Sequence, residues 1–142
     1  MRVEGRALAF LISALMTPFG ARVRALRAAR GMTLRQLAAQ LQVSAAYISA
    51  LEHGKRGAPS VGLVHQVCDA FGLIWDEAEE LARLAKLSHP RVVVDTSGLT
   101  PEQTALANRM AQSIGRLPPE VVSALHVVPV SYTHLTLPTN RE

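Results

Sequence analysis

Basic side chains are the residues of this 142-residue chain with the clearest chemistry, and they are unevenly distributed. Residues 16–57 carry a net charge of +6, because seven cations stand against one carboxylate, Glu52: Arg22, Arg24, Arg27, Arg30, Arg35, Lys55 and Arg56. Residues 58–90 carry −3, and residues 91–129 are neutral. Guanidinium and ammonium groups bind phosphate, so this asymmetry predicts contact with a polyanion at one end of the molecule.

No other set of residues has the spacing of a catalytic or metal-binding site. Glu52 lacks a second carboxylate or nucleophile beside it, and we expect it to pair with an arginine of the first helix. His65 and Cys68 share a helix face, but two ligands do not make a zinc site, and Cys68 fits better as a small buried thiol. Trp75 is expected to pack as a staple against helix 61–71. We predict no enzyme activity, no metal and no cofactor.

Helix start and stop signals divide the middle of the chain into short helices. Threonine or serine caps and a proline mark most of the starts, and glycines follow most of the ends. The predicted helices are 18–30, 34–41, 45–53, 61–71 and 76–87. Apolar residues make up 49% of the chain and recur on one face of each helix, so the sequence predicts an all-α domain with a core.

Residues 34–53 have the pattern that a helix-turn-helix requires, with two short helices and a tight link between them. Ala38 is small where the two helices cross, and Ile48 and Leu51 are apolar where the pair must pack against the rest of the domain. Small or polar residues occupy the other side of helix 45–53. That side is free to enter the major groove of DNA.

From Phe19 to Leu81 the chain resembles the Xre-type, lambda-repressor-like helix-turn-helix family of transcriptional regulators. The segments RxLRxARGMTLRQLA, VSxxYIS and LExGKR follow one another, with Pro-Ser before the fourth helix. The resemblance implies a five-helix DNA-binding domain that acts as a homodimer on a two-fold symmetric operator. Gln42 departs from the family, which usually has glycine in this turn. If the backbone is left-handed there, Gln42 costs some stability.

The positions that match the family imply the residues of the DNA interface. Four would face the bases: Ala45, Ala46, Ser49 and Ala50. Five would contact the DNA backbone: Arg35, Ser44, Tyr47, Lys55 and Arg56. The base-facing set lacks arginine, asparagine and glutamine, so sequence reading would depend on thymine methyl contacts, on Ser49 and on DNA shape.

The two ends of the chain differ from its middle. The apolar run 7–16 resembles a short signal peptide, but it falls short of the roughly 20 residues that cross a bilayer. We favour a translation start at Met16, which makes residues 1–15 an upstream extension. Residues 130–142 lack a helical period and resemble a translated sequencing-library adapter; the alternative is a Thr/Pro-rich tail. With its single cysteine, the protein is expected in the cytoplasm, at the nucleoid, without a membrane partner.

With residues 1–15 and 130–142 set aside, the sequence predicts a DNA-binding domain at residues 16–90 and a short helical extension at residues 91–129. A helix is expected from Thr100-Pro101 to about Ser113, and a last amphipathic stretch at 119–127. Apolar residues recur at helical spacing in the extension: Leu99, Leu106, Met110 and Ile114. They form either a dimerisation surface, which we favour, or a wall of the core.

The predicted function is sequence-selective binding of a double-stranded DNA operator, with helix 45–53 in the major groove, by a repressor or autoregulator of transcription. The alternative is an antitoxin-like or other protein-interaction module, in which residues 91–129 bind a protein partner.

Overall fold

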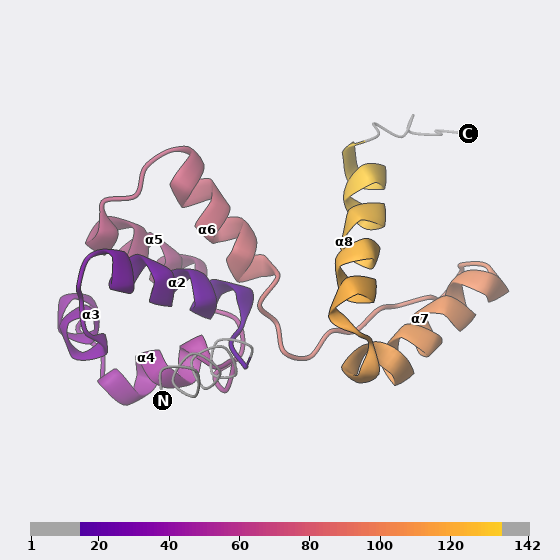
Figure 1. Ribbon diagram of the computed structural model, residues 1–142, viewed down its shortest axis with the longest axis horizontal. Helices are drawn as coiled ribbons and strands as arrows, with labels where there is room; N and C mark the ends of the chain where they lie inside the picture. Colours follow the sequence, from indigo (N-terminus) through magenta and orange to yellow (C-terminus); the bar gives the residue numbers. More distant parts are fainter. Residues whose placement is uncertain (1–14, 135–142) are drawn as a thin grey trace. The chain divides into compact units, whose positions relative to one another are not determined.

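The computed structural model describes residues 15–134, with side chains through residue 127 (Figure 1). As predicted, this part of the chain is all-α: it holds seven α-helices and one 3-10 helix, and no strand. It divides into two compact units between Val92 and Val93. The predictions for residues 1–14 and 135–142, which include most of the upstream extension and of the adapter-like tail, lie outside the described residues.

The first unit contains the five predicted helices, each within one residue of its expected ends. They are α2 (Pro18–Ala29), α3 (Leu34–Leu41), α4 (Ala45–Glu52), α5 (Val61–Phe71) and α6 (Asp76–Lys86). The side-chain oxygens of Thr17, Thr33, Ser44 and Ser60 accept amide hydrogens in the first turns of α2 to α5, as the cap residues predict.

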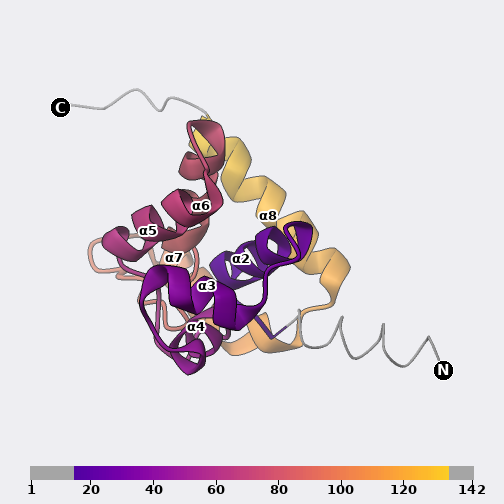
Figure 2. The same ribbon diagram turned by 90° about the vertical axis from the view of Figure 1, so that its left-hand side faces the viewer.

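These five helices enclose one core. Both views show the five helices gathered together (Figure 1, Figure 2). Helix α2 packs against α4 and α6, α3 packs against α4 and α5, and α5 packs against α6. The most deeply buried large side chains include Phe19, Leu37, Ile48 and Leu81, from four of the helices. Cys68 of α5 is buried as expected. The core therefore holds α3 and α4 together through their inward-facing side chains and leaves their outer faces to solvent.

The prediction that Trp75 packs against α5 is wrong. Its side chain is 82% exposed, and its backbone is left-handed, with φ 51°. Leu73, two residues earlier, is buried and fills the core position next to the end of α5. Because the chain turns sharply between Leu73 and α6, the side chain of Trp75 extends into solvent.

The second unit contains α7 (Pro101–Ser113), η1 (Ile114–Arg116) and α8 (Pro119–His134). Helix α7 begins where it was expected, and a capping box holds its start, since Thr100 and Gln103 each accept the other's amide hydrogen. Helix α8 was expected to end near residue 127, and it continues through residues 130–134, for which no helical period was expected. Elongation adds one hydrogen bond per residue, so an established helix can extend without an amphipathic pattern.

Candidate nucleic-acid interface

The turn between α3 and α4 sets the angle between the two helices. Gln42 ends α3 in the left-handed conformation, with φ 57° and ψ 40°, as its place in the turn suggested. The amide of Val43 then donates to the carbonyl of Ala38 at 3.0 Å. Ser44 begins α4, where its hydroxyl oxygen accepts from the amide of Tyr47 at 3.0 Å. The turn therefore satisfies its own backbone groups and places the start of α4 at the surface.

The end of α4 is fixed by the start of α2. The amide of Thr17 donates to the carbonyl of Glu52 at 3.1 Å. Gly20, one turn into α2, lies so close to α4 that a Cβ atom would overlap that same carbonyl oxygen. Only glycine permits this approach between the two backbones, so Gly20 determines how closely α4 packs.

Glu52 forms the predicted ion pair with a first-helix arginine, Arg27. The Nη2 atom of Arg27 lies 3.1 Å from Oε1, and Nε donates to the same oxygen at 3.2 Å. Burial raises the pKa of Glu52, and the positive charge of Arg27 opposes that rise. The carboxylate is thus committed to joining α2 to α4, which is a structural role.

The four residues predicted to face the bases differ in their accessibility. Ala46 is exposed, and Ser49 and Ala50 are half-buried. Ala45 packs partly against the core, as does the ring of Tyr47. The outer surface of α4 is therefore narrow and consists mainly of methyl groups and the Ser49 hydroxyl.

The three cations predicted to contact the DNA backbone lie at the start of α3 and directly after α4. Arg35, Lys55 and Arg56 are exposed, and none forms an ion pair with another residue in the described part of the chain. The guanidinium of Arg56 lies 5.8 Å from the centre of the Tyr47 ring, a cation–π distance that orients it beside α4. Ser44 is also exposed, at the start of the helix.

Other cations of the basic segment are used within the fold. Arg30 donates from Nη2 to the carbonyl of Phe71 at 2.9 Å, and its guanidinium lies 5.0 Å from the centre of that ring. Together with Arg27, it ties α2 to the other helices. The net charge of residues 16–57 therefore overstates the charge that is available to a ligand.

Two positions that the sequence analysis did not single out hold α2 in place. Gly20 could have been found, because glycine inside a helix is unfavourable unless packing requires it. Ser88, after α6, is buried; its hydroxyl accepts from the amide of Phe19 at 2.9 Å and donates to the carbonyl of Leu84 at 2.6 Å. Nothing in the local sequence marks Ser88.

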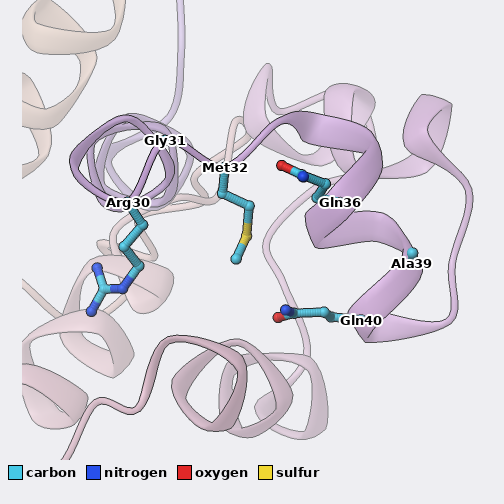
Figure 3. A pocket seen from close by; sticks show the side chains of 6 residues that line it. All are labelled: Arg30, Gly31, Met32, Gln36, Ala39 and Gln40. Carbon is cyan, nitrogen blue, oxygen red and sulfur yellow. The ribbon is translucent and has the colours of Figure 1, made fainter.

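A shallow hollow lies beside α3 (Figure 3). It is lined by Arg30, Gly31, Met32, Gln36, Ala39 and Gln40. Gln36 already accepts the amide hydrogen of Thr33 at 2.8 Å, so its carbonyl oxygen is occupied.

In the described part of the chain no group of three or more histidine, cysteine or acidic side chains could hold a metal ion. No helix described here is both long and apolar enough to cross a membrane.

Residues 18–84 match the family model described as a helix-turn-helix domain. This part of the chain is a helix-turn-helix domain. Such domains are characteristic of transcriptional regulators, a class of proteins distinct from enzymes. In it, α3 and α4 are the two helices of the motif, and α4 holds the position of the helix that reads DNA in such domains.

Two curated relatives from Bacillus subtilis (strain 168) match the same part of the chain. The HTH-type transcriptional repressor RghR is 41% identical over 61 residues, which cover 43% of this chain and 45% of that protein. The uncharacterized HTH-type transcriptional regulator RghRB is 44% identical over 52 residues, which cover 37% of each chain. The chain thus spans less than half the length of these relatives. No solved structure matches it.

Proposed function

We propose that this protein is a sequence-selective, double-stranded-DNA-binding regulator of transcription that acts as a repressor. A homodimer would place α4 of each copy in the major groove of an operator at the nucleoid. Helix-turn-helix domains bind DNA in this way, and one relative is a repressor by name.

One observation carries the proposal: exposed cations that form no ion pair in the described part of the chain lie at the start of α3 and directly after α4. Arg35 lies in the first turn of α3, and Lys55 and Arg56 follow the end of α4. An exposed cation that forms no ion pair can neutralise a phosphate and release its condensed counterion. The small side chains between them let α4 approach the base edges closely.

The salt dependence of binding tests this arrangement. With about five phosphates neutralised per subunit, log Kobs against log[salt] should have a slope on the order of −9 for a dimer. The triple variant Arg35→Gln, Lys55→Gln, Arg56→Gln removes three contacts per subunit, which should lower the steepness by about 5. Fluorescence anisotropy on a labelled duplex gives both slopes.

A matched control keeps the loss of general charge separate from the loss of specific contacts. Lys86 and Arg91 are also exposed, after the acidic part of the first unit. The double variant Lys86→Gln, Arg91→Gln should leave the slope within about one unit of wild type. Equal slopes for wild type and the triple variant would contradict the proposal that DNA binds at α4.

Recognition of the DNA sequence is tested by modifying the DNA rather than the protein. Selection from random duplexes identifies the preferred site and its symmetry. Replacing thymine by uracil in that site deletes only the C5 methyl group. If Ala46 and its neighbours read thymine methyls, each deletion within the α4 footprint should weaken binding several-fold, and deletions outside it should not. A site insensitive to every methyl deletion would leave DNA shape as the source of selectivity.

A further inference from the structure

Large apolar side chains are exposed on α7 and in the segments at its two ends, as far as the structure describes the second unit. No residue of α7 is buried. Leu106 lies within the helix, Leu99 lies just before its Thr100 cap and Ile114 lies after it in η1; their side chains are 63%, 50% and 60% exposed. Figure 1 shows α7 and α8 diverging from η1, so α8 does not lie along the length of α7. A row of this kind on a helix with so little intrachain packing marks a contact surface.

The charges beside this row select one kind of partner. Glu102 and Arg109 are seven residues apart, so they lie on the same flank of the apolar row. In an antiparallel pair of identical helices, equivalent flanks face each other, and Glu102 of one copy meets Arg109 of the other. In a parallel pair this flank faces the opposite flank, and neither charge finds its counterpart.

The apolar residues require the same register as the charges. An antiparallel pair centred near Leu106 places the two Leu106 side chains together. The same register brings Leu99 of one copy to Ile114 of the second copy. One arrangement therefore covers the apolar row and pairs the charges twice by symmetry.

We propose that α7 is a dimerisation helix that pairs antiparallel with α7 of a second copy, with Leu106 at the two-fold axis. This inference deepens the proposed function, because it supplies the surface that forms the homodimer. Its test needs no DNA.

Disulfide trapping of the full chain distinguishes the orientation. Cys68 is buried, so wild type serves as the control without a reactive thiol. Under mild oxidation, Leu106→Cys should give a cross-linked dimer on a non-reducing gel. Ile114→Cys should not, because the two copies of that residue would be about 24 Å apart along the axis. Asn108→Cys, on the opposite face of α7, controls for random collision.

Charge exchange provides an independent measurement. By sedimentation, Glu102→Arg should weaken the dimer about tenfold, and adding Arg109→Glu should restore it. Cross-linking of Ile114→Cys as efficient as that of Leu106→Cys, or no excess of Leu106→Cys over Asn108→Cys, would overturn the antiparallel pair. The salt-dependent binding of DNA by α4 would be unaffected by that failure, so the two proposals can fail separately.

Discussion

Gln42 is the position at which the domain should be easiest to stabilise. It ends α3 with φ 57° and ψ 40°, a conformation that costs a residue with a Cβ about 1–2 kcal/mol. Its side chain is exposed and forms no hydrogen bond with a described residue. Replacing it by glycine therefore relieves the backbone without losing a contact.

The expected gain follows from two opposing effects. Glycine removes the left-handed penalty, but it adds about 0.5–1 kcal/mol of conformational entropy to the unfolded chain. Gln42→Gly should therefore raise the free energy of unfolding by about 0.5–1 kcal/mol, which corresponds to about 2–8 °C in the Tm of a domain of this size. The amide of residue 42 keeps its hydrogen bonds at the end of α3 in either case.

Thermal unfolding followed by circular dichroism measures the effect, with urea unfolding as a second measurement. Gln42→Ala keeps a Cβ atom and should stay within about 0.5 kcal/mol of wild type, since the strain remains. Gln40→Gly places glycine on the exposed face of α3 and should destabilise by about 1 kcal/mol. The reasoning is refuted if Gln42→Gly is no more stable than wild type, or if Gln42→Ala stabilises as much.

Three further variants test the contacts that hold α2 and α4 in place. Gly20→Ala should cost about 3 kcal/mol in urea unfolding, because its Cβ would overlap the carbonyl of Glu52; Gly62→Ala, where the space is open, should not destabilise. Ser88→Ala should cost about 1–3 kcal/mol, since it strands a buried amide, whereas an exposed serine would cost almost nothing. Because the pKa of Glu52 is raised, wild type should lose stability as pH rises from about 4.5 through that pKa, by at most about 1.4 kcal/mol per pH unit. Glu52→Gln should lack this dependence, and an identical pH profile would contradict the assignment.

The sequence predicts the helices of the first unit well because α2 to α5 begin at local cap residues and α6 begins with acidic residues in its first turn. Thr33, Ser44 and Ser60 cap helices through contacts that span only three residues. The capping box at Thr100 is local in the same way. Interactions of this range depend on side-chain chemistry alone, so a sequence pattern is enough to predict them.

The parts that sequence reasoning missed depend on contacts between distant residues. Trp75 is exposed because Leu73 occupies the core, a competition that no local pattern decides. Ser88 bonds to a residue 69 positions away in the chain. The orientation of each depends on the final packing of the helices.

The structure also separates what holds α4 from what α4 could read. Its inner and terminal contacts, through Ile48, Leu51 and Glu52, are buried and join it to α2 and the core. Its outer residues, such as Ala46, make no contact that the fold requires. Under the proposed function, stability and DNA reading would use different faces of one helix, so substitutions on the outer face would change the sequence preference without a cost in folding. On the same proposal, the exposed cations would supply affinity for the phosphates, and the small side chains of the outer face would let the backbone of α4 lie close to the bases.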